Sequence, residues 1–451
     1  VGMITIPNWM FLTSYENIRK FLVRSCHIDS LIHNGRGVWG SDFGSCSFIF
    51  RRSGLKGYLG KFKRLFQSQG SVASNEELVK RFLSYPDYFA KSDDFLKIPG
   101  SPIAYWVKES LISAFQKFPP LSDLADPRQG LATGNNDEFL RFWPEVDFKK
   151  SSLSSHACGQ DKKWFPYNKG GDYRKWYGNI ENFVNWENDG EKIKNYIDYN
   201  GKLRSRPQNT RFYFKESVSW TLLSSSYFGV RYVPEGCIFD INGMSCFPEN
   251  EVFPVLGFMA SKVCFQFLRF LNPTLAFQVG DIKRLPVKVL KDVEFSRNVE
   301  ELIRLSKLDW DSFETSWDFS EFLLVKFSSG KGEVSSSLQC LRNNWDNAIE
   351  KTKSLEESNN KFITSEYGLD KELDPYVSAR EITLTCNPYY RYGSNRSEEE
   401  LETLLQCDTL KELVSYAIGC MMGRYSLDKP GLILASQGDT VRDYLAQISE
   451  P

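Results

Sequence analysis

Two short motifs contain residue types and spacings that are used in chemistry on nucleotides and bases. The first, Gly35-Arg36-Gly37-Val38-Trp39-Gly40, matches the GxGxxG loop. Such a loop holds phosphates when the N-terminal amides of a following helix point at them. Here Ser41-Asp42-Phe43-Gly44 leads into a predicted strand. We therefore interpret the match as a coincidence in a glycine-containing loop and expect no cofactor there.

The second motif is Cys386-Asn387-Pro388-Tyr389-Tyr390, which follows the strand-like run 382–385. Enzymes that methylate base amines use an Asn/Asp-Pro-Pro-aromatic loop, in which the ring stacks on a flipped-out base. The motif departs from that loop at its second proline, and no glycine loop suited to S-adenosylmethionine precedes it. We favour an aromatic turn between two C-terminal elements. Methyl transfer through Asn387 is the alternative.

A cationic segment predicts contact with nucleic acid. Between residues 162 and 215 it has twelve Lys and Arg against six Asp and Glu, in a chain of net charge −1. Tryptophan and tyrosine rings and glycines lie between these cations, which suits phosphate and base contacts. A solvated basic face is the alternative. The cations are Lys162, Lys163, Lys169, Arg174, Lys175, Lys192, Lys194, Lys202, Arg204, Arg206, Arg211 and Lys215.

A polar turn precedes this segment. Gly130-Leu131-Ala132-Thr133-Gly134-Asn135-Asn136 presents short donors and acceptors that suit phosphates or base edges. Together, the turn and the segment predict a set of DNA-contacting residues: Thr133, Asn135, Asn136, Lys162, Lys163, Lys169, Arg174, Lys175, Arg204, Arg206 and Arg211.

Composition argues against several other classes of protein. The ten cysteines include no CxxC pair, and with three histidines they predict buried thiols in a reducing cytoplasm and no metal site. No apolar run approaches the roughly 20 residues that span a bilayer, and we expect no membrane partner. A net charge near zero also excludes a global field that attracts DNA, so any nucleic-acid role depends on a local patch.

The order of predicted elements indicates several domains. Residues 1 to 52 predict strand, helix, strand, loop and strand, with strands at 28–32 and 46–50 and a capping box of Thr13 and Glu16 before Ile18, Phe21 and Leu22. Three strands cannot bury both faces of a sheet, so we expect this to be the tail of a larger one. The apolar opening 1–6 and the helical pattern at 446–451 also predict a fragment.

Further helices are predicted from caps and periodicity. They are 75–85 capped by Ser74, one starting at Ser101-Pro102, 254–271, 298–308, 335–357 and 397–423 capped by Ser397.

Several motifs of the chain resemble those of known methyltransferases. The 130–136 loop resembles the entry loop of the target-recognition domain in type IIG-like adenine methyltransferases. Five further segments resemble the PglX family of BREX phage-defence methyltransferases: Gly2-Met3-Ile4-Thr5 with Trp9-Met10-Phe11-Leu12, Lys163-Trp164-Phe165-Pro166-Tyr167-Asn168-Lys169-Gly170-Gly171, Arg204-Ser205-Arg206-Pro207-Gln208-Asn209, Phe277-Gln278-Val279-Gly280-Asp281-Ile282 and Gly423-Arg424-Tyr425-Ser426-Leu427-Asp428-Lys429-Pro430-Gly431.

The resemblance implies a parent enzyme that transfers a methyl group from S-adenosylmethionine to adenine N6 in double-stranded DNA, alongside other phage-defence proteins. In that family, the cofactor and Asn-Pro-Pro-Tyr loops precede the segment matching Gly2-Met3-Ile4-Thr5. We therefore expect neither a catalytic residue nor a cofactor in this chain. A free-standing DNA-specificity or partner-binding module is the alternative.

The expected fold class is α/β and α+β in a multidomain chain. It comprises the tail of a Rossmann-like methyltransferase sheet (1–55), a helical connector (56–124), a mixed α/β target-recognition domain (125–290) and a mainly helical C-terminal region (291–451).

Overall fold

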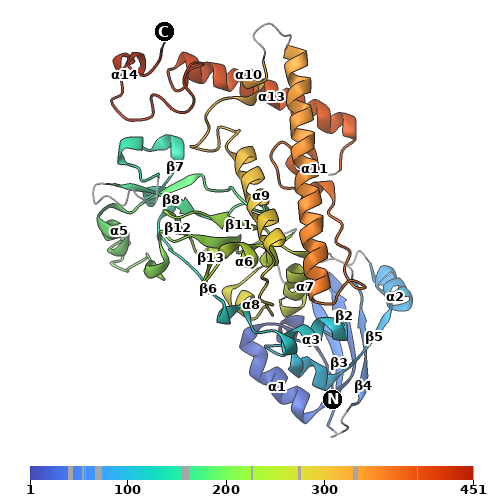
Figure 1. Cartoon of the computed structure of the whole chain (residues 1–451). Helices are drawn as coiled ribbons and strands as arrows, with labels where there is room; N and C mark the ends of the chain where they lie inside the picture. The colour runs from blue at the N-terminus through green and yellow to red at the C-terminus, as the bar shows by residue number, and fades with distance from the viewer. Residues whose placement is uncertain are drawn as a thin grey trace.

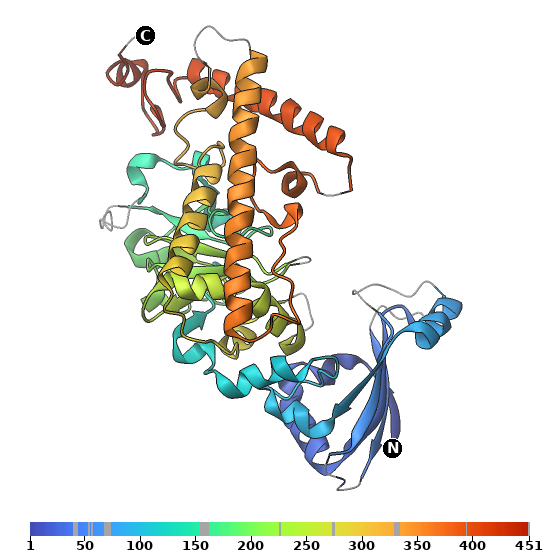
Figure 2. The same ribbon diagram turned by 45° about the vertical axis from the view of Figure 1, so that its right-hand side comes forward.

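The computed structural model describes residues 1–38, 44–52, 55, 57–66, 74–153, 162–224, 227–272, 276–328, 334–393 and 395–449. In these residues an N-terminal sheet is followed by two central sheets and then by a mainly helical C-terminal part (Figure 1). The N-terminal sheet projects from the body, and the long helix α11 (Val334–Glu366) runs alongside the central part (Figure 2). The chain is thus a mixed α/β protein of several parts, as expected.

The N-terminal sheet has five strands in the order β1-β3-β2-β4-β5. Strands β2 and β4 are parallel, whereas the other neighbouring pairs are antiparallel. The succession of strand, helix, strand, loop and strand expected for the first 52 residues is confirmed. The strands are β1 (Gly2–Thr5), β2 (His27–Gly35), β3 (Ser45–Arg51), β4 (Leu59–Arg64) and β5 (Asp87–Lys91).

The expectation of a helical connector from residue 56 is wrong, because β4 and β5 add two strands to this sheet. A period-two pattern was present in β4, where Phe62 is buried on one face and Lys61 and Lys63 lie on the other. Helices α2 (Asn75–Ser84) and α3 (Glu109–Lys117) complete the segment. The predicted cap of α2 is confirmed, since the Ser74 hydroxyl accepts a hydrogen bond from the Glu77 amide at 3.2 Å.

One face of the sheet is covered by α1 (Glu16–Ser25) and a 3₁₀ turn at Ser92–Lys97. The predicted capping box is wrong: Thr13 lies in a 3₁₀ turn, and no side chain caps α1. Ile18 and Phe21 are 50% and 66% exposed. The helix buries Val23 in the core of the sheet, with Leu22 packed against it, and also buries Arg19, whose guanidinium donates to four main-chain carbonyls. Hydrogen bonding and apolar packing therefore both orient α1.

A buried histidine makes the stability of this sheet depend on pH. Burial, aided by the charge of Arg64, lowers the pKa of His33 to about 3. Because an unfolded histidine titrates near 6.5, only the unfolded state takes up this proton as the pH falls towards 5, and stability falls with it. We expect this site to cost about 2 kcal/mol between about pH 7 and pH 5.

Urea unfolding of the wild type and His33→Asn at the two pH values measures this cost. The pH-dependent loss should be smaller by that amount in the variant. An equal loss in both proteins would show that His33 is not the group that titrates.

The central part contains two four-stranded sheets, ordered β11-β10-β13-β6 and β12-β8-β9-β7. The strands of these two sheets are short. They are β6 (Ala125–Arg128), β7 (Leu140–Phe142), β8 (Trp164–Asn168), β9 (Asn182–Asn185), β10 (Ser217–Thr221), β11 (Val230–Val233), β12 (Ile238–Phe239) and β13 (Gly243–Pro248), with the short helices α4 (Asn136–Phe139) and α5 (Glu187–Lys194).

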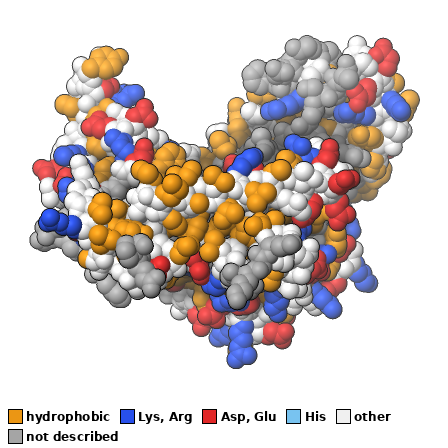
Figure 3. All heavy atoms as spheres, turned by 90° about the horizontal axis from the view of Figure 1, so that it is seen from above, with side chains coloured by type: hydrophobic (Ala, Val, Ile, Leu, Met, Phe, Trp, Pro, Cys, Tyr) orange, Lys and Arg blue, Asp and Glu red, His pale blue; other side chains and the backbone are white. Residues whose placement is uncertain are grey.

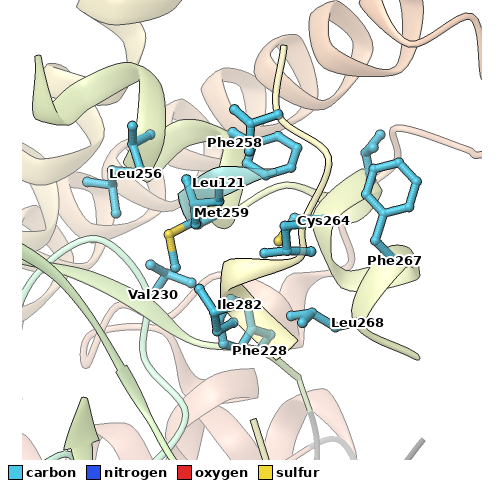
Figure 4. Close-up of a cluster of buried hydrophobic side chains, with 14 of the residues drawn as sticks. Leu121, Phe228, Val230, Leu256, Phe258, Met259, Cys264, Phe267, Leu268 and Ile282 are labelled. Atoms are coloured by element: carbon cyan, nitrogen blue, oxygen red, sulfur yellow. The ribbon is translucent and has the colours of Figure 1, made fainter. Parts of the chain in front are cut away.

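The largest core lies between the first of these sheets and two consecutive helices (Figure 4). A single helix was expected over 254–271, but the chain forms α6 (Val252–Met259) and α7 (Lys262–Leu271), bent by 63°. Ser261 caps α7 by accepting from the Cys264 amide at 3.2 Å. The break allows both helices to bury apolar side chains, including Leu256 and Phe267, in the same core.

The helix expected at Ser101-Pro102 is also wrong. Ser101 has a φ of +48°, outside the right-handed helical region, and α3 begins only at Glu109. The Ile103 amide donates instead to the Met10 carbonyl at 3.0 Å, which ties this segment to the N-terminal part. A tertiary contact therefore satisfies an amide that, at the start of a helix, would have had no main-chain partner within that helix.

The C-terminal part is mainly helical, as expected. The predicted capping box of α13 is confirmed, because Ser397 and Glu400 bond reciprocally to each other's backbone amides. The helices are α8 (Val279–Lys283), α9 (Val293–Trp310), α10 (Leu323–Lys326), α11, α12 (Pro388–Arg391), α13 (Glu398–Met421) and α14 (Val441–Leu445).

Helix α13 lies at the top of the molecule in Figure 1. Seen from above, hydrophobic side chains gather in a band, and the surface is hollowed between two projections (Figure 3). Among the exposed apolar residues of α13 are Val414, Ile418 and Met421.

Among the described residues, no single helix is long and apolar enough to cross a membrane. The bent pair α6 and α7 passes by length and composition, and its apolar side chains belong to the main core.

Candidate nucleic-acid interface

The polar loop 130–136 is held against a distant segment by main-chain hydrogen bonds. Ala132 and Arg206 exchange two bonds of 3.1 and 2.8 Å, and the Leu131 amide donates to Phe239 in β12 at 2.8 Å. A Cβ on Gly130 would lie 1.9 Å from the Phe239 oxygen, so only glycine fits there. The loop thus has a defined conformation beside residues 204–206.

Two amide side chains also hold the start of the loop against this distant segment. Gln208 donates to the Gly130 carbonyl at 3.2 Å, and Asn209 donates to the Gln129 carbonyl at 2.8 Å. Asn209 itself adopts a left-handed conformation with a φ of +55°. We did not predict these two positioning residues. The sequence feature that could have identified them is the short motif that they share with Arg204 and Arg206.

The three predicted side chains of the loop have different surroundings. Thr133 is buried and donates to the Asn136 side-chain oxygen at 2.6 Å. Asn135 caps α4 and donates to the Tyr196 hydroxyl at 3.1 Å. Asn136 is exposed, and no described residue accepts from its side-chain nitrogen. Asn136 is therefore the loop side chain available to a ligand, whereas Thr133 and Asn135 shape the loop.

Three of the predicted arginines lie exposed along the segment that pairs with the loop. Arg206 has no acidic partner in the described part of the chain, and Arg204 has a loose one, Asp198, at 3.6 Å. The Arg211 guanidinium lies 4.8 Å from the Phe212 ring centre. Surface guanidiniums with weak or absent acidic partners retain their donors for phosphates. We define Asn136, Arg204, Arg206 and Arg211 as the loop surface.

Lys169 borders this surface at the end of β8. The β8 carbonyl of Asn168 accepts a 3.0 Å hydrogen bond from Asp240, whose own carbonyl accepts from the Gly130 amide at 3.3 Å. Burial raises the pKa of Asp240, while hydrogen bonds from Tyr167 and Asn242 and the charge of Lys169 oppose the rise. Part of the Lys169 charge is therefore already balanced inside the protein.

Lys162 and Lys163 lie before the opposite end of β8. At roughly 3.3 Å per residue, six residues of strand place Lys163 about 20 Å from Lys169. Lys162 donates to the Lys149 carbonyl at 2.6 Å, and Lys163 lies over the Trp164 ring at 5.2 Å. Both side chains are therefore engaged by neighbouring residues, and Lys163 lies far from Lys169 along the strand.

Arg174 and Lys175 correct the prediction most clearly, because both are buried. Arg174 pairs with Asp309 at 2.8 Å and donates to the Thr385 hydroxyl at 2.9 Å. Lys175 pairs with Glu356, which also accepts from the Trp176 indole at 2.7 Å. Both cations join the central sheets to the C-terminal helices and are out of reach of a surface ligand.

The motif at residues 386–390 is held by contacts within the protein. Asn387 is fully buried, caps α12 and donates to the carbonyls of Ala379 and Ile382 at 2.7 and 2.8 Å. The strand-like run before it is not a strand. The aromatic turn that we favoured is therefore what forms, and the Asn387 amide is already occupied.

The glycine-containing loop begins where β2 ends and precedes β3. Trp39, Gly40 and Ser41-Asp42-Phe43 lie outside the described residues, as do His156 and Cys158. Among the side chains that are described, no group of three His, Cys, Asp or Glu residues is placed to hold a metal ion. The described cysteines are all free thiols.

Sequence comparison defines the class of protein: the chain is homologous to adenine-specific methyltransferases over almost its entire length. It is 35% identical to the adenine-specific methyltransferase BrxX of Escherichia coli O9:H4 (strain HS), over 97% of this chain and 35% of BrxX. It is 34% identical to the adenine-specific methyltransferase PglX of Lacticaseibacillus casei (strain Zhang), over 96% of this chain and 36% of PglX. The resemblance to the PglX family is thus confirmed.

The chain spans about a third of the length of these relatives. No family model matches it. Among solved structures, the type IIL restriction-modification enzyme MmeI in complex with DNA aligns with a TM-score of 0.45 and 11% identity, over 92% of this chain and 50% of MmeI. The type IIG restriction endonuclease BpuSI aligns at 0.30 and 13%, over 81% and 47%. TM-scores this low do not establish a common fold.

Proposed function

We propose that this chain is the DNA-reading portion of an adenine-specific DNA methyltransferase of a BREX-type phage-defence system. The observation that supports this most directly is the loop surface. Two segments far apart in sequence are paired by main-chain hydrogen bonds and together present Asn136, Arg204, Arg206 and Arg211. Arginines bind phosphates and guanine edges, and asparagine reads adenine, so the surface has the chemistry to bind and discriminate DNA.

The same proposal assigns methyl transfer to parts of a longer protein. The parent would use S-adenosylmethionine, as the names of the relatives imply, and would act with other phage-defence proteins. Within the described residues, the Asn387 amide is used internally and is not free to accept a base amine. Among the described residues, strand β1 pairs only with β3, so its other edge is open to further strands of a methyltransferase sheet.

Fluorescence anisotropy with labelled duplex DNA tests the proposal. We expect binding that weakens steeply between about 50 and 200 mM salt, because phosphate contacts release counterions. Calorimetry with S-adenosylmethionine should give no heat of binding to this chain. Absence of DNA binding even at low salt would refute the reading function.

Replacing Asn136 tests which part of the surface reads sequence. We expect Asn136→Ala to lower affinity for the recognised site by roughly 5- to 100-fold, the effect of about 1–3 kcal/mol lost at one base pair, and to change binding to random DNA little. A selection from randomised duplexes identifies the recognised site first. Asn135→Ala is the matched control, because it removes a helix cap and should cost about 1 kcal/mol of stability. Equal losses on specific and random DNA would contradict a reading role for Asn136.

A further inference from the structure

Cationic and aromatic side chains meet at the end of the N-terminal sheet, away from the loop surface. His33 and Arg64 are register partners at the carboxyl ends of the parallel strands β2 and β4. Both lie on the covered face, since Leu31 and Phe62, two residues earlier on each strand, are buried there. In open α/β sheets, ligands bind outside the carboxyl ends of parallel strands.

The Arg64 side chain is held by rings and not by a carboxylate. Its guanidinium lies 4.4 Å from the centre of the Phe66 ring and 4.9 Å from that of Trp106. Contact with rings occupies the faces of the guanidinium and leaves its N–H edges free. No described residue pairs with it, and its Nε is buried without a hydrogen-bond partner. A buried guanidinium nitrogen without a partner is uncommon and marks a place where a ligand atom could accept its hydrogen.

A second arginine adds charge to the same place. Arg269, on α7, is exposed and near enough to Arg64 for its charge to lower the Arg64 pKa, an effect smaller than that of burial. Among the described residues, Arg269 also has no acidic partner. Since α7 belongs to the central part, the two guanidiniums lie on either side of the junction with the N-terminal sheet.

Two further polar atoms in this cluster have no partner. The Nδ1 atom of His33 and the hydroxyl of Tyr105 are buried without hydrogen bonds, and these residues are 6% and 3% exposed. Burial raises the pKa of the Tyr105 hydroxyl, so it remains a donor. Among the described residues, the cluster combines unused donors and positive charge with no carboxylate, which suits an anion with several acceptor oxygens.

We propose that Arg64 and Arg269 bind a phosphate of the nucleic-acid backbone at the carboxyl ends of β2 and β4, with Phe66 and Trp106 holding Arg64 in place. The proposal rests on the proposed function in that the ligand is DNA. It adds a second contact region, on the N-terminal part. DNA bound to the loop surface and to this site bridges the central sheets and the part that continues into the methyltransferase sheet.

Neutralising the two arginines tests the proposal. We expect Arg64→Gln and Arg269→Gln each to weaken duplex binding several-fold at low salt, equally for all sequences, and to reduce the salt slope by about one. Arg64→Lys should restore the slope but not the full affinity, because ammonium keeps the charge and lacks the planar fork. Arg304→Gln, an exposed arginine of α9, is the matched control and should bind as the wild type does.

If Arg64→Gln does not fold, Arg269→Gln still tests the proposal, because Arg269 is exposed. Wild-type affinity and slope in both Gln variants, with binding still weakened by Arg206→Gln, would overturn this inference and leave the proposed function standing.

If the wild type binds no DNA, inorganic phosphate is the second probe. A rise in melting temperature in phosphate over chloride at equal ionic strength, absent in Arg64→Gln and Arg269→Gln, would support the site even though the proposed function had failed. If the wild type binds no DNA and shows no phosphate effect, both this inference and the proposed function are overturned.

Discussion

Replacing Asp309 with alanine is expected to lower the free energy of unfolding by about 3–5 kcal/mol, as for other buried ion pairs that lose one partner. The side chains of Asp309 and Arg174 are 5% and 3% exposed and pair at 2.8 Å. The same carboxylate accepts hydrogen bonds from the amides of Thr385 and Cys386 at 2.7 and 3.0 Å. Removing it leaves the buried guanidinium without its carboxylate, and the buried Cys386 amide and part-buried Thr385 amide without their acceptor.

Urea unfolding of the wild type, Asp309→Ala and Glu301→Ala measures this loss. Glu301 pairs with Arg304 on the surface of α9, so its replacement should cost less than about 1 kcal/mol. If Asp309→Ala costs no more than this control, the buried pair does not hold the central sheets to the C-terminal helices.

The largest expected effect on function is the loss of DNA binding when the loop surface is neutralised. In a variant with Arg204→Gln, Arg206→Gln and Arg211→Gln, we expect affinity at low salt to fall by about 100-fold or more and the salt slope to fall by about three, since each arginine contacts one phosphate. Stability should change little, because all three side chains are exposed.

A matched variant controls for the lost charge. Arg304, Lys326 and Lys411 are exposed cations of the C-terminal part, and replacing all three with glutamine removes the same net charge. We expect this control to retain most of the affinity and slope. If both triple variants lose binding equally, the protein responds to overall charge, and the loop surface has no special role.

Local features were predictable. The caps of α2 and α13 form where Ser74 and Ser397 indicated, because a capping hydrogen bond links residues only three positions apart. Predictions that assumed a continuous local pattern failed where a tertiary contact competed with it. The segment after Ser101 forms no helix, and its Ile103 amide bonds to Met10. Helices α6 and α7 separate at Ser261, so both pack in the same core.

The candidate site was predictable in composition but not in arrangement. The sequence alone showed a cationic, aromatic segment and a polar loop, and its motifs established the relationship to the PglX family. Which cations face outward depended on the fold. Arg174 and Lys175 are buried because their acidic partners, 135 and 181 residues further along the chain, are brought to them.

What the sequence determined by itself was therefore residue type, local caps and homology, because these depend on near neighbours or on the order of residues. Only the tertiary structure decided that the 130–136 loop pairs with Arg206 and that Arg64 lies between Phe66 and Trp106. The physical reason is that burial and pairing of a charge are set by groups remote in sequence, and the same arginine stabilises a core beside a carboxylate or binds phosphate without one.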